Sequence, residues 1–270
     1  MQSAYLLVSH GSRDPRPQVA MAHLAGLISQ PKARVEATGW VQTVRDTRLN
    51  TLNHRSQSSA NGRSVAPPVS EPLVGTACLE LSPKPLHEQI KEFGGSVASG
   101  CKCIQVVPLF LLPGVHVMED IPAEVAIAQE ALSQELKIDL RPHLGTHPGL
   151  SRLLTTQLAA TTDAQILLAH GSRRTGSKEP VEAMARQVGA VSAYWAVPPS
   201  LESRVKELVD AGHRQIGIMP YFLFAGGITD AIAQSVEQLK VQFPGTLLEL
   251  AEPLGASAEL ADLIWDLMER

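Results

Sequence analysis

Short apolar runs alternate with longer amphipathic stretches along the chain. The first run, residues 5–9, is mostly apolar and is followed by a His-Gly pair, a pattern typical of a strand buried on both faces. Residues 17–29 then carry apolar side chains at helical spacing. The alternation continues through the first half, with strands predicted at 75–81, 104–112 and 140–144 and helices at 85–98, 121–132 and 149–159.

The second half repeats this order of elements. Its predicted strands lie at 165–169, 191–197, 215–224 and 247–251, and its helices at 178–188, 200–211, 229–241 and 257–268. Strands that alternate with helices form parallel sheets covered by helices on both faces. The hydrophobic pattern therefore predicts an α/β fold.

Segments of the first half recur in the second half in the same order, which indicates an internal duplication. LLVSHGSR at 6–13 recurs as LLAHGSR at 167–173, VPLFLLPG at 107–114 as MPYFLFAG at 219–226, and RPHLGTHPGL at 141–150 as AEPLGASAEL at 251–260. We therefore predict two similar four-stranded parallel-sheet lobes, residues 1–160 and 161–270, that face each other across a cleft. In such sheets ligands bind outside the carboxyl ends of the strands.

The first copy contains an insertion at residues 45–72 that has no counterpart in the second copy. This segment is polar and rich in Ser, Asn, Arg and Pro. A segment of this composition buries too little apolar surface to order itself, so we predict a long or disordered loop.

Composition narrows the class of protein. A net charge of −4 argues against a general nucleic-acid binder, which needs a basic face. Three cysteines without framework spacing argue against a secreted disulfide scaffold. The first residues lack a basic leader, and no apolar stretch approaches the roughly 20 residues of a membrane span. We expect a cytoplasmic protein, or one in a plastid-like interior if a transit peptide has been removed.

Residues able to bind a metal follow successive strands of the first copy. His10 follows the first strand, Glu80 ends the second, and His116 lies on the loop after the third. The carboxyl ends of parallel strands share one rim, so these side chains are expected to converge. Two nitrogens and one oxygen suit Zn, Fe, Co or Ni better than Mg or Ca. In the competing interpretation, His10 bonds its own turn.

The second copy is an internal control for these candidates. It retains His170, but Ala196 aligns with Glu80, and the loop AGGITDAI lacks a histidine. The fold therefore does not need Glu80 or His116, which favours a functional role for both. By the same comparison, His170 is predicted not to be essential.

Other polar residues of the first copy are weaker candidates. Ser12, Arg13 and nearby backbone N–H groups could receive an anionic group at the start of the next helix. Glu119 and Asp120 lie at another helix start, where negative charge is favoured in any case, so a capping role and a functional role are both left open for Asp120; Glu119 is also taken as a substrate-binding candidate. The residues that flank the fourth strand, His143 and His147, have no predicted direction. The chain has no GxGxxG or GxxxxGK[ST] motif, so nucleotide binding is not expected.

The segments LLVSHGSRDPR, TACLEL and PLFLLPGVHVMEDIP, in this order, resemble the sirohydrochlorin chelatase family. These are class II tetrapyrrole chelatases of the CbiX and SirB type, and the resemblance is to the long, internally duplicated form. It implies a ferrochelatase-like pair of lobes in which His10 and His116 are catalytic and, with Glu80, hold the metal. It further implies insertion of Fe²⁺ or Co²⁺, with Ni²⁺ in related members, into sirohydrochlorin during sirohaem or cobalamin synthesis.

The resemblance also sets expectations about cofactors and partners. The chain lacks the His-rich tail and the Cys-bearing extension of some members, so no iron–sulfur cluster is implied, and no nucleotide is required. We expect a monomer with a tetrapyrrole substrate and without a membrane or nucleic-acid partner. The alternative from another class is a non-catalytic carrier of metal or tetrapyrrole. A flavodoxin-like regulatory domain is disfavoured because it leaves Glu80 and His116 unexplained.

Overall fold

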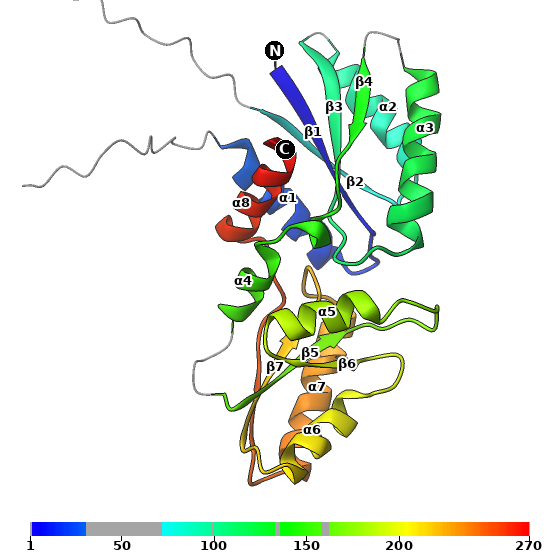
Figure 1. Ribbon diagram of the computed structural model, residues 1–270. Coiled ribbons are helices and arrows are strands. Elements are labelled where there is room, and N and C mark those ends of the chain that lie inside the picture. Colours follow the sequence, from blue (N-terminus) through cyan, green and yellow to red (C-terminus); the bar gives the residue numbers. More distant parts are fainter. Residues whose placement is uncertain (1, 31–71, 99, 133–135, 158–161, 270) are drawn as a thin grey trace, which may run out of the picture.

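Two four-stranded, all-parallel sheets form the protein, one in each of two stacked lobes (Figure 1). The computed structural model describes residues 2–30, 72–98, 100–132, 136–157 and 162–269. The strand order is β2-β1-β3-β4 in the first sheet and β6-β5-β7-β8 in the second, so the two sheets repeat one topology. The predicted α/β fold and duplication are confirmed. The insertion at 45–72 falls almost entirely outside the described residues.

The first sheet is built around β1 and is covered by helices on both faces. Tyr5 and Leu7 face a core formed with α1 and α8, whereas Leu6 and Val8 face a core formed with α2 and α3. Both sets of side chains are buried, which explains the mostly apolar run in the sequence. The elements are β1 (Gln2–Ser9), α1 (Pro15–Ser29), β2 (Leu73–Cys78), α2 (Leu86–Val97), β3 (Cys101–Pro108), α3 (Ile121–Ala131), β4 (Lys137–Leu140) and α8 (Ala258–Glu269).

The second sheet is covered in the same way. Helices α4 and α5 lie on one face, and α6 and α7 lie on the other. The elements are α4 (Leu150–Thr155), β5 (Ala164–Ala169), α5 (Glu179–Gln187), β6 (Val191–Tyr194), α6 (Leu201–Asp210), β7 (Gln215–Pro220), α7 (Gly227–Gln242) and β8 (Leu247–Leu250). No helix among the described residues is long and apolar enough to cross a membrane.

The last helix of each copy packs on the sheet of the other copy. Helix α4 follows β4, yet Leu150 and Leu154 lie in the core of the second lobe. Helix α8 follows β8, yet Ile264 lies in the core of the first lobe beside α1 (Figure 1). The guanidinium of Arg141 donates to the carbonyl of Leu267 at 2.9 Å and ties the end of α8 to the first sheet. The predicted lobe limits, 1–160 and 161–270, follow the sequence repeats. By its packing, however, α8 belongs to the first lobe.

Several element boundaries differ from the predicted ones. The strands predicted at 104–112 and 215–224 end at Pro108 and Pro220, although the N–H groups of the next residues, Leu109 and Tyr221, still donate to Val8 and Leu168. The strand predicted at 140–144 is Lys137–Leu140, and a 3₁₀ turn, η2 (Leu144–Thr146), follows it. The loop predicted around His116 is instead a π-helical turn, η1 (His116–Asp120), that runs directly into α3.

The exchange of helices predicts that α8 stabilises the lobe on which it packs. Ile264 is fully buried, so Ile264→Ala should lower the free energy of unfolding by about 2–5 kcal/mol through lost burial and a residual cavity. The measurement is denaturant unfolding monitored by Trp fluorescence. Exposed Glu259, in the first turn of the same helix, provides the control, and Glu259→Gln should change the value by less than about 1 kcal/mol, the size of a helix-terminus charge effect. Equal stability of the two variants would contradict the packing.

Candidate metal site

The side chains of His10, Glu80 and His116 meet at the carboxyl rim of the first sheet. One ligand atom from each lies within 4.8 Å of the others. Nε2 of His10 is 3.8 Å from Oε2 of Glu80, and the centroids of the two imidazole rings are 4.9 Å apart. The residues follow β1, β2 and β3, which are adjacent in the sheet. The structure thus brings together the three ligand candidates from the sequence.

The backbone beyond β1 and β2 sets the separation of His10 and Glu80. The ladder continues past both strands, because the N–H of Leu79 donates to the carbonyl of Ser9 at 2.9 Å and that of Glu80 donates to His10 at 2.8 Å. Gly11 has a φ of +98°, and a Cβ there would lie 2.0 Å from the carbonyl oxygen of Glu80. Glycine is therefore required at this position for the two ligands to approach.

Asp120 orients the ring of His116. Oδ2 of Asp120 lies 2.7 Å from Nδ1 of His116, and Asp120 makes no side-chain capping bond to α3. A carboxylate accepts here, so Nδ1 carries the proton and Nε2 keeps its lone pair for a metal. Asp120 stands at the N-cap position of α3, but capping alone does not explain it, because its carboxylate is bonded to His116. The i,i+4 spacing of His116 and Asp120 is the sequence signal for this hydrogen bond. It was not recognised because a loop, and not a helical turn, was expected at His116.

The site is open to solvent on one side and bounded by an aromatic ring on another. The side chains of His10 and Glu80 are 51% and 50% exposed, whereas that of His116 is 28% exposed. The ring of Phe110 lies 6.4 Å from that of His10 and 6.2 Å from that of His116. A metal held here would keep coordination positions open toward solvent, as sites that exchange ligands do.

The remaining histidines of this region do not join the site. His143 is buried, and its Nδ1–H donates to the carbonyl of Phe110 at 2.9 Å, which fixes the chain between β3 and η1. His147 is also buried, and its Nδ1 accepts from the N–H of Gly149 at 3.0 Å. Both are held by their neighbours in the fold.

The substrate-binding candidates lie near the rim. Ser12 and Arg13 are exposed, and Oγ of Ser12 accepts from the N–H of Asp14 at 3.0 Å. Asp14 caps α1, and its hydrogen bonds from Arg16 lower its pKa to about 2. Glu119 lies 3.8 Å from the guanidinium of Arg174 in the second lobe. Their binding roles remain predictions.

The second lobe has the same backbone without the same ligands. The N–H of Trp195 donates to Ala169 and that of Ala196 donates to His170, both at 2.9 Å, as Leu79 and Glu80 do in the first lobe. The structure therefore places Ala196 at the position equivalent to Glu80. Among the residues that the structure describes, His170 does not belong to a group of three potential metal ligands.

The fold and site together define a two-lobed α/β protein with an open, solvent-facing group of side chains that suit a transition metal. The model of the CbiX family matches residues 50–161 and 164–270, one match in each half, and the chain belongs to the CbiX family. The first match includes Glu80 and His116 and begins after His10.

Individual relatives share both sequence and fold. A sirohydrochlorin cobaltochelatase of Priestia megaterium is 25% identical over 209 residues, 71% of this chain and 67% of that protein. A sirohydrochlorin ferrochelatase of Priestia megaterium is 26% identical over 207 residues, 72% of this chain and 76% of that protein. SirB from Bacillus subtilis with Fe³⁺ superposes with a TM-score of 0.70 at 22% identity, covering 100% of this chain and 95% of SirB.

The bond between Asp120 and His116 predicts that Asp120 supports metal binding. Asp120→Asn should weaken Co²⁺ binding by roughly 10- to 100-fold, because partners of a ligating histidine fix its tautomer and basicity. The measurement is a Co²⁺ titration followed by visible absorption. Asp210→Asn, which removes an exposed carboxylate paired with Lys206 on α6, is the matched control and should leave the affinity unchanged. Equal affinities in both variants would refute the role of Asp120.

Proposed function

We propose that this protein is a sirohydrochlorin chelatase that inserts a divalent metal, Fe²⁺ or Co²⁺, into sirohydrochlorin. The observation that carries the proposal is the set of three ligand atoms of His10, Glu80 and His116 within 4.8 Å at an open rim. Family membership and the names of both relatives from Priestia megaterium support the same substrate.

The metal is a substrate in this reaction and must be both bound and released. His10, His116 and Glu80 would hold it, since neutral imidazole and carboxylate suit Fe²⁺ and Co²⁺. Because His10 and Glu80 are half exposed, the pyrrole nitrogens of a macrocycle can replace these ligands from the solvent side. A closed, four-ligand site would instead retain the metal as a structural ion.

Insertion also requires that the macrocycle lose two N–H protons as the metal enters. His10 would act as ligand and base: in the tautomer whose Nδ1–H donates to the carbonyl of Gly11, 3.3 Å away, Nε2 keeps its lone pair on the side of Glu80. His116, oriented by Asp120, would be the second ligand or base. The reaction exchanges one divalent cation for two protons and involves no change in oxidation state.

Further details of the proposal rest on the relatives and on composition. The relatives named cobaltochelatase and ferrochelatase, together with SirB structures described with Fe³⁺ and with cobalt, favour these two metals. We place the reaction in sirohaem or cobalamin synthesis and the protein in the cytoplasm, acting as a monomer without a nucleotide.

The two histidines should act as a unit on one metal. His10→Ala and His116→Ala should each remove most insertion activity, and the double variant should be little worse, because residues that act together are non-additive. The measurement is the anaerobic rate of Fe²⁺ or Co²⁺ insertion into sirohydrochlorin against metal concentration. Full activity in His116→Ala would contradict the assignment of His116 as a ligand or base. A wild-type protein that binds both substrates without accelerating insertion would be a carrier.

The second histidine of the duplicated motif should be dispensable. The residue bonded through its backbone to His170 is Ala196, where the first copy has Glu80, so His170→Ala should keep most of the turnover. The same assay should compare the insertion rates of His170→Ala and His10→Ala, because the two histidines occupy equivalent positions in the two copies. Loss of activity in a folded His170→Ala variant would mean that both lobes supply reactive groups.

A further inference from the structure

The second lobe has a pocket beside Ala196, the position equivalent to Glu80 of the first lobe. A cavity of about 580 Å³ lies between residues 172–176 with Lys178 on one side and residues 196–198 on the other. The first segment follows the His170-Gly171 pair, and the second begins at Ala196, the counterpart of Glu80. The rim of the second lobe therefore has a cavity beside the position at which the carboxylate of Glu80 is replaced by Ala196.

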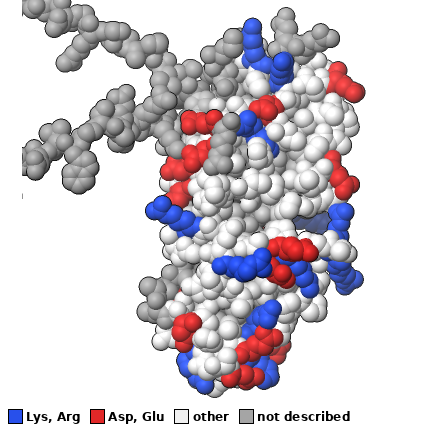
Figure 2. Space-filling view, viewed as in Figure 1, with Lys and Arg blue, Asp and Glu red and all other residues white. Residues whose placement is uncertain are grey.

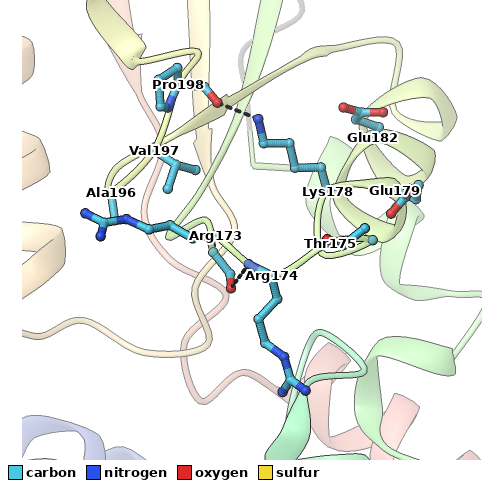
Figure 3. Close-up of a pocket in the computed structure, with 11 residues that line it drawn as sticks. Arg173, Arg174, Thr175, Lys178, Glu179, Glu182, Ala196, Val197 and Pro198 are labelled. Carbon is cyan, nitrogen blue, oxygen red and sulfur yellow. Dashed lines mark hydrogen bonds between the residues drawn. The ribbon is translucent and has the colours of Figure 1, made fainter.

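Three cationic side chains line this pocket (Figure 3). Nζ of Lys178 donates to the carbonyl of Pro198 at 2.8 Å and lies 5.4 Å from the centre of the Tyr194 ring, so Lys178 is held against the pocket wall. Arg173 and Arg174 extend from the loop in different directions, and both are exposed (Figure 3). Guanidinium groups present paired donors that match the two oxygens of a carboxylate.

The charge of the pocket opposes that of the whole chain. Glu179 and Glu182 are the acidic residues of the lining, so three cations face two carboxylates. The chain as a whole carries a net charge of −4. A local excess of positive charge on an acidic protein marks the pocket as a place for an anionic group.

Arg174 connects the pocket with the metal site of the other lobe. Its guanidinium lies 3.8 Å from the carboxylate of Glu119, which belongs to the same π-helical turn as His116. The Arg174 side chain is 63% exposed, so this ion pair is loose and can exchange partners. Figure 2 shows Lys and Arg side chains beside the notch between the lobes.

We propose that this pocket binds carboxylate arms of the tetrapyrrole whose centre lies on His10, Glu80 and His116. The proposal rests on the proposed function, because it assigns a second contact to the same substrate. Arg173 and Arg174 pair with the carboxylates, and Arg174 leaves Glu119 when the substrate arrives. The first copy holds the metal, and the second copy holds the periphery of the macrocycle.

Equilibrium binding of metal-free sirohydrochlorin to the full chain tests this assignment without requiring turnover. Arg173→Gln and Arg174→Gln should each raise the Kd about tenfold, the loss expected for a charge-assisted hydrogen bond at an exposed position. Arg186→Gln removes an exposed arginine from the last turn of α5 and should change the Kd less than about twofold. Co²⁺ affinity, measured without tetrapyrrole, should be unchanged in all three variants.

A second arm of the experiment uses the macrocycle with its carboxylates esterified. It should bind the wild type more weakly, and the differences between the wild type and the two arginine variants should disappear. Persistence of those differences would overturn the proposal, as would arginine variants that bind sirohydrochlorin like the control, or a wild type that does not bind it. A wild type that binds sirohydrochlorin through these arginines but does not insert metal would refute the proposed function alone.

Discussion

The close approach of Gly11 to the carbonyl of Glu80 is the constraint on which the metal site depends. It allows the β1–β2 ladder to continue past both strands, and so brings the residues on either side, His10 and Glu80, into range of one ion. Gly171 keeps a positive φ of +82°, with Tyr194 and Val197 where its Cβ would lie. The backbone turn therefore needs the glycine in both copies, whereas the carboxylate opposite it, Glu80, is replaced by Ala196 in the second copy.

The exchange of α4 and α8 explains why a copy without the metal ligands remains part of the molecule. Each sheet has one face that is completed by a helix from the other copy. Removal of the second copy would leave the apolar side chains of β1 and α1 without their partners on α8. Additional cross-lobe bonds join Arg16 to Asp230 at 2.6 Å and the hydroxyl of Tyr221 to the carbonyl of Leu111 at 3.2 Å. Each lobe is thus required for the stability of the other.

The order of elements and the convergence of His10, Glu80 and His116 could be predicted from sequence for physical reasons. Apolar periodicity separates strands from helices, and parallel strands bring their carboxyl ends to one rim. The packing of α8 could not be predicted this way, because an apolar stripe shows that a helix needs a partner without showing which sheet provides it. The hydrogen bond between His116 and Asp120 could not be predicted from apolar periodicity, because a π-helical turn has no distinct apolar period in the sequence.

Under the proposed function, electrostatics gives a reason for two rims that differ in charge. Glu80 and nearby Asp120 make the metal site attractive to a divalent cation, but they repel the carboxylate arms of an incoming tetrapyrrole. Arg13 already lies near these ligands, at the position equivalent to Arg173; further cationic side chains there would relieve that repulsion but would also disfavour metal binding. A duplicated fold resolves the conflict, since Arg173 and Arg174 lie on the other lobe, where they can attract the periphery of the macrocycle while its centre meets the acidic site.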